Sequence, residues 1–419
     1  MTDTETKNFS QNVSSSYYLR GECSDECKKD SLNVPKLRFK GYNDEWKQNK
    51  LGNLFEIKAG GDIDNKKLSK NKNEQYKYPV YANALQNNGL YGYSDIYKIS
   101  GETITVTGRG DVGHAIARKE NYYPIVRLLI LKPIVKQDVD FWANAINNTR
   151  IFVESTGVPQ LTAPQLAKIK IYYPSLPEQE KIASFLTLID KKIEKQKELI
   201  ELLKKYKRGL LSQIFSQKLR FKDDNGNDYP EWKEKTLGEV TNNISYGLNA
   251  ASKAYDGENK YIRITDIDET TGKYNNLDIV SPDCDLSDEY KLKNDDLLFT
   301  RTGASTGKTY LYNKNDGKMY FAGFLIKFSI KEEYCSNFVF YITQTFNYKK
   351  WVSIMSTRSG QPGINAKEYS KYKFLCPVYD EQIKISNIVL KIDNIIEKET
   401  LLLSFYNNYK KGLLQQMFI

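Results

Sequence analysis

The chain has 419 residues, enough for two or more domains that each bury a core of their own. It carries 62 Lys and Arg against 52 Asp and Glu, a formal charge of +10 that is compatible with an acidic partner. No secretory signal precedes the five scattered cysteines, and no apolar run reaches the ~20 residues of a membrane span, so we expect a reduced, cytoplasmic protein with no membrane partner.

Residues 1–33 are polar and rich in Ser, Thr and Asn, which predicts a flexible N-terminal tail. Cys23 and Cys27 in this segment have the spacing of half a zinc site. No second cysteine pair lies nearby, and the only histidine is His114. The sequence therefore predicts no metal site.

Two similar domains follow the tail, over residues 34–176 and 218–377. The first opens on KLRFKGYNDEWKQNKLG at 36–52, and the second opens on KLRFKDDNGNDYPEWKEKTLG at 218–238. The shared LRFK, EW and LG elements indicate an internal duplication.

Inside each domain an extended apolar segment meets a glycine loop, ETITVTGRGDVGH at 102–114 and DLLFTRTGASTGK at 296–308. We align the two loops at an offset of 194, which places Thr107 on Arg301 and Arg109 on Gly303. Later in each domain a Gly/Pro turn precedes an expected strand. These turns hold Gln160 and Gln361.

Each domain is followed by a long helix, predicted over 177–217 and 378–419. Residues 178–215 align without a gap on 381–418, at an offset of 203 (381 minus 178), and 17 of the 38 positions are identical. Both copies carry apolar residues at coiled-coil spacing. The residues of this seam are Ile182, Leu186, Ile189, Ile193, Ile200, Leu203 and Leu210 in the first helix, and Ile385, Val389, Ile392, Ile396, Leu403 and Leu413 in the second.

Two matching seams favour pairing of the helices with each other, although each helix packing on its own domain is an alternative. We therefore predict an α+β protein in which two domains are separated by two long antiparallel coiled-coil helices. Antiparallel pairing would relate the two halves by a pseudo-twofold. Two separated domains of this kind suit a target with two half-sites.

Three stretches mimic catalytic motifs. RTGASTGKT (301–309) ends like a P-loop but is one residue short, and a strand and polar turn follow it where a P-loop has a helix. Gly-x-Gly-x-x-Gly at 108–113 has neither the helix nor the acidic residue of a dinucleotide site. PDCDLSDEYK (282–291) resembles a nuclease motif with too few intervening residues. A P-loop ATPase or a single-chain nuclease is the enzymatic alternative, and a coiled-coil scaffold without DNA is a third. We interpret the chain as non-catalytic.

The whole arrangement resembles the specificity (S) subunit of type I restriction–modification systems. The resemblance rests on the two LRFK…EW…LG openings, on the turns with Gln160 and Gln361, and on the paired EQ…I…ID…IEK…YK.GLL.Q.F helices. It covers nearly the whole chain beyond the tail.

The resemblance implies that residues 34–176 and 218–377 are target-recognition domains, each reading half of an interrupted sequence in double-stranded DNA. The paired helices would set the gap and dock two methyltransferase subunits, and motor-nuclease restriction subunits would join them. S-adenosylmethionine, ATP and Mg²⁺ would then belong to the partner subunits, with no cofactor in this chain.

Phosphate contacts by Lys and Arg would supply affinity, and a few side chains would read base edges. Arg can grip guanine, and Gln can grip adenine. On that chemistry the candidate DNA-binding residues are Thr107, Arg109 and Gln160 in the first domain, and Arg301, Thr302, Ser305, Lys308, Arg358 and Gln361 in the second. Because the aligned loops differ in sequence, we predict two unlike half-sites.

Overall fold

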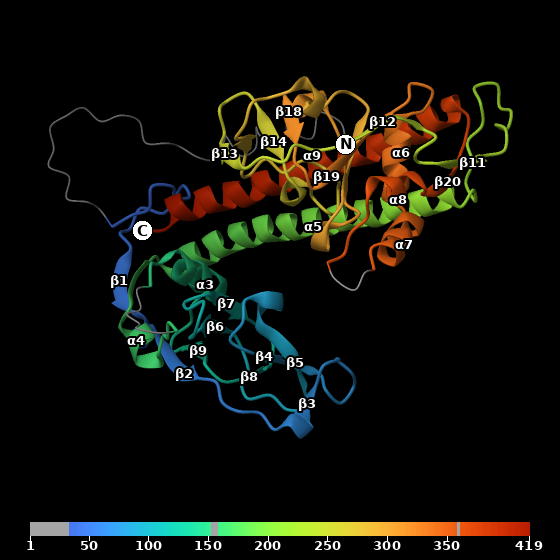
Figure 1. Ribbon diagram of the computed structural model, residues 1–419. Coiled ribbons are helices and arrows are strands. Elements are labelled where there is room, and N and C mark those ends of the chain that lie inside the picture. The colour runs from blue at the N-terminus through green and yellow to red at the C-terminus, as the bar shows by residue number, and fades with distance from the viewer. Residues whose placement is uncertain (1–32, 152–157, 358–360) are drawn as a thin grey trace. The chain divides into compact units, whose positions relative to one another are not determined.

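The computed structural model describes residues 33–151, 158–357 and 361–419, and the chain divides into two compact units (Figure 1). Unit 1 takes the chain up to Lys197 together with Leu401–Ile419, and unit 2 takes Glu198–Thr400. Of the expected tail, only Asn33 is among the described residues. No helix in the described ranges is both long and apolar enough to span a membrane.

Unit 1 is built on a four-stranded antiparallel sheet in the order β2–β9–β6–β7. A second sheet, β3–β5–β4–β8, contains the parallel pair β4–β8. The strands are β1 (Lys47–Lys50), β2 (Phe55–Ala59), β3 (Leu68–Ser69), β4 (Tyr78–Tyr81), β5 (Leu90–Ser94), β6 (Thr103–Thr107), β7 (Ala115–Arg118), β8 (Tyr123–Pro124), β9 (Leu128–Pro133) and β10 (Lys170–Tyr173), of which β1 pairs with β10. The short helices are α2 (Leu51–Leu54), α3 (Val139–Asn148) and α4 (Ala163–Lys168).

Unit 2 repeats this plan. Its four-stranded antiparallel sheet has the order β12–β19–β16–β17, and a parallel pair, β14–β18, again accompanies it. The strands are β11 (Lys233–Thr236), β12 (Thr241–Tyr246), β13 (Ser252–Ala254), β14 (Lys260–Ile262), β15 (Val280–Pro282), β16 (Asp296–Thr300), β17 (Thr309–Leu311), β18 (Met319–Phe321), β19 (Leu325–Ile330) and β20 (Lys373–Cys376). The short helices are α6 (Ser336–Thr343), α7 (Phe346–Met355) and α8 (Ala366–Ser370).

The strand that leads into each glycine loop is the most deeply buried part of its sheet. All five residues of β6 (TITVT) and all five of β16 (DLLFT) are buried. Helix α3 packs Phe141 and Trp142 into the core of unit 1, and α6 packs Phe338 into the core of unit 2. Each glycine loop therefore begins from a rigid support.

Two long helices, α5 (Leu176–Phe215) and α9 (Tyr379–Met417), contribute to both units. In unit 1, Ile182 and Leu186 near the start of α5 share a core with Leu413 and Met417 near the end of α9. Further along α5, Asp190 pairs with Lys410 at 2.5 Å. Contacts move toward the N-terminus of α9 as residue numbers increase along α5, so the two helices run antiparallel here.

The same pairing recurs in unit 2 with the helices exchanged. Lys207 of α5 pairs with Asp393 of α9 at 2.6 Å, and Leu211 and Ile214 share a core with Ile385 and Val389. Lys207 and Lys410 are 203 residues apart, as are Asp190 and Asp393 (410 minus 207, 393 minus 190). The α+β class, the internal repeat and the antiparallel long helices expected from the sequence are confirmed.

The predicted seam residues lie on the inner side of the helices. Nine of them are buried: Ile182, Leu186, Ile193, Ile200, Ile385, Val389, Ile392, Ile396 and Leu413. The other four are half-buried: Ile189, Leu203, Leu210 and Leu403. Burial lowers the pKa of Lys207 within this seam, although Asp393 opposes the shift. A buried ion pair at a seam helps to select one register over others.

A glutamate in the first turn of each long helix accepts hydrogen bonds from the segment that opens the preceding domain. Arg38 Nε and Nη2 donate to the Glu178 carboxylate at 2.7 and 2.8 Å, which ties the LRFK motif to the EQ motif. In unit 2, Arg220 and Trp232 donate to Glu381 in the same way. Both glutamates are almost fully buried, at 1% and 0% exposure.

The neighbouring glutamines hold the short helices. Gln179 accepts from the Asp138 N–H at the start of α3 and donates to the Pro174 carbonyl. Gln382 bonds Cys335, at the start of α6, and Pro377 in the same way. The repeated EQ motif is therefore a structural joint between helix and domain.

Replacement of Glu381 by Gln is expected to lower the free energy of unfolding by about 2 kcal/mol, because hydrogen bonds to a charged group contribute roughly 1.5–3 kcal/mol. Urea unfolding of the full chain, followed by tryptophan fluorescence, measures this change. Asp380→Asn is the control, since Asp380 is exposed, and its effect should stay within about 0.5 kcal/mol. Equal effects of the two variants would contradict this role of Glu381.

Candidate nucleic-acid interface

The two glycine loops are held by the same backbone contacts. In unit 1 the Leu161 N–H donates to the Gly108 carbonyl at 2.8 Å, and the Gly110 N–H donates to Pro159 at 3.0 Å. In unit 2, Ile364 donates to Arg301 at 2.9 Å, and Gly303 donates to Pro362 at 2.9 Å. Each Gly/Pro turn of the sequence therefore lies against the glycine loop of its own domain.

In each loop, the hydroxyl of a buried threonine hydrogen-bonds two backbone groups of the turn. Thr107 Oγ1 accepts from the His114 N–H at 2.9 Å and donates to the Asp111 carbonyl. Thr300 Oγ1 accepts from the Lys308 N–H at 3.0 Å and donates to the Ser305 carbonyl.

These bonds correct the predicted alignment. Thr107 corresponds to Thr300, an offset of 193 (300 minus 107), so Gly108 matches Arg301 and Arg109 matches Thr302. The predicted offset of 194, which put Thr107 on Arg301 and Arg109 on Gly303, is wrong at the start of the loop. It holds only from Asp111 and His114 onward, because the extra residue of unit 2 lies inside the turn, at Gly303–Ser305.

The P-loop lookalike has a different backbone path from a phosphate-binding loop. It connects β16 to β17 through a short 3-10 turn. The strand and polar turn expected after the loop are confirmed as β17 and a 3-10 turn at Lys314–Asp316. Its Thr306, Gly307 and Lys308 amides donate to carbonyls of the same loop and strand. These amides are thus not presented to a phosphate, as those of a P-loop are.

Local backbone conformation and packing explain why glycine occupies these positions in the loops. Gly307 has a φ of +91°, and a Cβ there would lie 2.4 Å from Val352 Cγ1 on α7. A Cβ on Gly108 would lie 2.5 Å from the Arg127 carbonyl oxygen. Left-handed backbone and close packing therefore explain residues that nucleotide-binding patterns also require.

Arg301 lies in a hollow of unit 2. The hollow has a volume of about 710 Å³, and its lining includes Tyr246, Arg301 and Phe324. The Arg301 guanidinium lies over the Tyr246 ring, 5.0 Å from its centre. Phe324, which is 57% exposed, lines the same hollow. A second arginine there, Arg263, is already paired with Asp266 and Asp278, so Arg301 is the arginine of the hollow that can act as a bidentate donor.

The remaining candidates lie at different depths. Gln160 and Gln361 are exposed, and Arg109 is half-buried next to Gln160, its partner in a β-bridge. Thr302, Ser305 and Lys308 are half-buried on the second loop. Thr107 is buried, which favours a role in loop structure over contact with a ligand. Arg358 lies outside the described residues.

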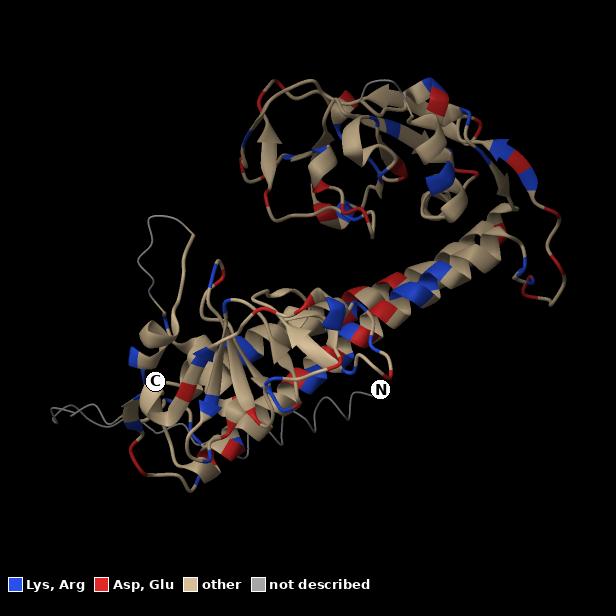
Figure 2. Ribbon diagram, turned by 90° about the horizontal axis from the view of Figure 1, so that it is seen from below, with Lys and Arg blue, Asp and Glu red and all other residues tan. Residues whose placement is uncertain are grey.

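Sequence reasoning missed three residues at these loops. Tyr246 and Phe324 line the same hollow as Arg301, and Asn83 holds the first loop, where its Oδ1 accepts from the Gly108 and Arg109 amides. Nothing in their local sequence distinguishes them from ordinary core or turn residues. Figure 2 shows Lys and Arg spread over helices, strands and loops of both units and interleaved with acidic residues, so charge alone does not mark a binding face.

Comparison with known families points to one class of protein. The family model described as "Type I restriction modification DNA specificity domain" matches residues 43–205 and 229–403. A putative type I specificity subunit of Mycoplasma pneumoniae, S.MpnORF507P, is 32% identical over 144 residues. That match covers 34% of this chain and 39% of the relative, so the chain spans well under half of the relative's length.

Two solved structures share the fold. The S subunit of a type I restriction–modification system from M. genitalium has a TM-score of 0.62 at 18% identity, with 92% of this chain and 99% of that chain covered. A chain from a structure of complex assembly and conformational transition of the type I R-M system has a TM-score of 0.53 at 12% identity, with 90% and 98% covered.

Thr107→Val is expected to destabilise unit 1 by about 1–3 kcal/mol, because the His114 N–H and the Asp111 carbonyl lose their partner. Thr302→Val, in the glycine loop of unit 2, is the control, because the Thr302 side chain makes no capping hydrogen bond there. Thermal unfolding followed by circular dichroism compares the two. A Thr107→Val chain of unchanged stability that binds DNA more weakly would instead assign Thr107 to the DNA contact.

Proposed function

The chain belongs to the family of type I restriction–modification DNA specificity domains, and we propose that it is a sequence-specific DNA recognition subunit. Each domain reads one half of a bipartite target, and the paired helices determine the gap between the halves. The observation that carries this proposal is the duplicated loop. One set of backbone bonds holds both loops, while the side chains that the loops present differ.

The chemistry of the second loop suits the reading of a base edge. Arginine presents donors in a rigid fork that matches O6 and N7 of guanine. Stacking on Tyr246 restricts the guanidinium of Arg301 before DNA binds, which reduces the entropy lost on binding. At the matching position of the first loop stands Gly108, followed by Arg109. The two domains then recognise unlike half-sites.

Repeated apolar pairs on the outer side of the helices supply docking points for two methyltransferase subunits. Leu199 and Leu202 of α5 are 40% and 63% exposed, and their repeat equivalents on α9, Leu402 and Phe405, are 36% and 59% exposed. Exposed apolar groups at matching positions mark a surface that a partner covers. One such pair lies in each unit, which fits two copies of one partner.

In this proposal the chain contributes binding and leaves catalysis to other subunits. S-adenosylmethionine would serve the methyltransferase subunits, and ATP and Mg²⁺ would serve the motor-nuclease restriction subunits. The complex acts on cellular DNA, so the proposed location is the cytoplasm.

A genome-wide map of N6-methyladenine tests the reading role, with the methyltransferase partner present throughout. A two-part motif with a fixed gap should be present with this gene and absent after its deletion. Arg301→Ala should relax one half of that motif only, since a bidentate contact contributes about 1–3 kcal/mol of discrimination. Lys314→Ala, an exposed site beyond β17, is the control. A map that the deletion leaves unchanged would refute the proposal.

Native mass spectrometry tests the docking points. The wild-type chain should carry two methyltransferase subunits, Leu202→Glu should carry one, and Leu202→Glu with Phe405→Glu should carry none, because a buried unpaired charge opposes association. Lys197→Glu introduces the same carboxylate, with an even larger change in charge, five residues before Leu202 and about 140° round the helix, and should keep both partners. Two bound partners in the double variant would rule these points out.

A further inference from the structure

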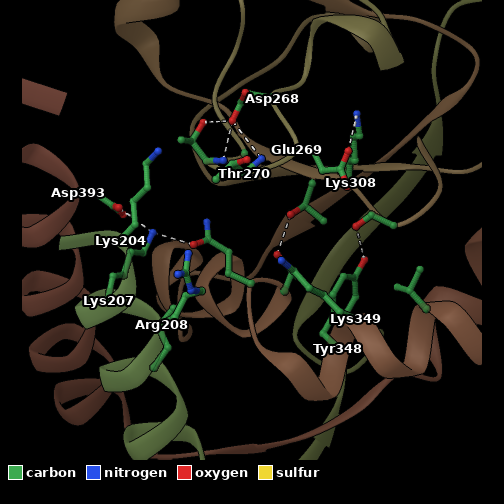
Figure 3. Close-up of a pocket in the computed structure, with 18 of the residues that line it drawn as sticks. Lys204, Lys207, Arg208, Asp268, Glu269, Thr270, Lys308, Tyr348, Lys349 and Asp393 are labelled. Atoms are coloured by element: carbon green, nitrogen blue, oxygen red, sulfur yellow. Dashed lines mark hydrogen bonds and ion pairs between the residues drawn. The ribbon is translucent and has the colours of Figure 1, made fainter. Parts of the chain in front are cut away.

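Unit 2 contains a second hollow, which is lined by other residues of the same loop than Arg301. Its volume is about 510 Å³, and it lies between α5, the 268–272 turn, the 304–309 segment and α7 (Figure 3). Lys204 and Arg208 line it from α5, Lys308 from the loop and Lys349 from α7. With Lys207 of α5, five cationic side chains from three elements line one cavity, and Lys204 among them is paired with Glu201 at 2.8 Å.

Three acidic side chains line the cavity against five cationic ones, so a positive excess remains. Asp268 Oδ1 accepts from the Thr270 and Thr271 amides, which holds this carboxylate within the turn. Glu269 lies 3.7 Å from Lys308 Nζ and is 80% exposed, so this is a weak surface pair. Asp393 is paired with Lys207. Arg208 and Lys349 form no ion pair within the described part of the chain.

A residue that lines this cavity also carries a buried donor. Gln344 lines it, and its Oε1 accepts from Lys207 Nζ at 2.8 Å. Because an ammonium group can only donate, this bond orients the amide with its nitrogen away from Lys207. The Gln344 Nε2 is buried and has no hydrogen-bond partner among the described residues. A buried amide without an acceptor costs free energy, and a bound acceptor would remove that cost.

We propose that this cavity binds a phosphate group, and that in the working protein the group is a phosphodiester of the DNA backbone. A phosphate oxyanion accepts hydrogen bonds from Arg208, Lys349 and the Gln344 amide together. The assignment to DNA rests on the proposed function. Since Arg301 and Lys308 belong to one loop and line two hollows of the same unit, a duplex read at Arg301 would pass its backbone near the cavity.

Unit 1 differs at this point. His114 occupies the position of Lys308, since each donates its backbone N–H to the loop threonine. Burial, with a smaller contribution from Arg118, lowers the pKa of His114, so the imidazole is neutral at neutral pH. The position that Lys308 occupies beside the cavity therefore carries an uncharged side chain in unit 1.

The test compares the full chain with Arg208→Gln/Lys349→Gln. Lys205→Gln/Lys350→Gln is the matched control, because both lysines are exposed neighbours outside the cavity lining. Fluorescence anisotropy with a labelled duplex of random sequence gives the affinity at several salt concentrations. The slope of log K against log salt should fall by about 0.9 for each phosphate that the variant no longer neutralises. A parallel titration measures binding of inorganic pyrophosphate.

A lower salt slope in the cavity variant alone, with an unchanged methylation motif, supports the site and assigns it to the DNA backbone. Pyrophosphate binding that the cavity variant abolishes, with an unchanged salt slope, supports a phosphate site filled by a small molecule. Equal slopes and no pyrophosphate binding overturn the proposal. If the wild-type chain binds no DNA, the proposed function fails, and the pyrophosphate titration alone then decides whether the cavity takes phosphate.

Discussion

A buried carboxylate in the first turn of each long helix is the interaction on which the rest of the molecule depends. Glu178 and Glu381 receive an arginine from the LRFK segment that opens their own domain. The adjacent glutamines attach the short helices α3 and α6. A charge buried without its partner is strongly destabilising, so the domain opening and the long helix have to assemble together.

The helix seam adds a second ionic element. Lys207 with Asp393 and Lys410 with Asp190 are the same pair seen in the two halves of the repeat. An apolar stripe alone tolerates a shift of register, whereas a shifted register would leave these charges without partners. The seam thus combines apolar burial, which supplies affinity between the helices, with ion pairs, which select their alignment.

Duplication of the scaffold leaves the loops free to diverge. Backbone bonds and a buried threonine hold both loops, so the exposed side chains can change without loss of the turn. In the second loop, Arg301 lines one hollow and Lys308 lines another. This also explains why one loop resembles a P-loop and the other a dinucleotide motif, since both need glycine for positive φ and close packing.

The order of residues along the chain is enough to predict the α+β class, the duplication and the antiparallel helices, because apolar periodicity and repeat identity are properties of that order. The spacing of Gly303 and Gly307 also excludes a P-loop path. The correspondence between loop residues becomes visible only in the folded chain, because a one-residue insertion inside a turn leaves no sequence signal, whereas hydrogen bonds show it directly. The hollows beside Arg301 and Arg208 likewise join residues more than 50 positions apart, such as Tyr246 with Arg301 and Arg208 with Lys349. Their chemistry arises from proximity that no local pattern encodes.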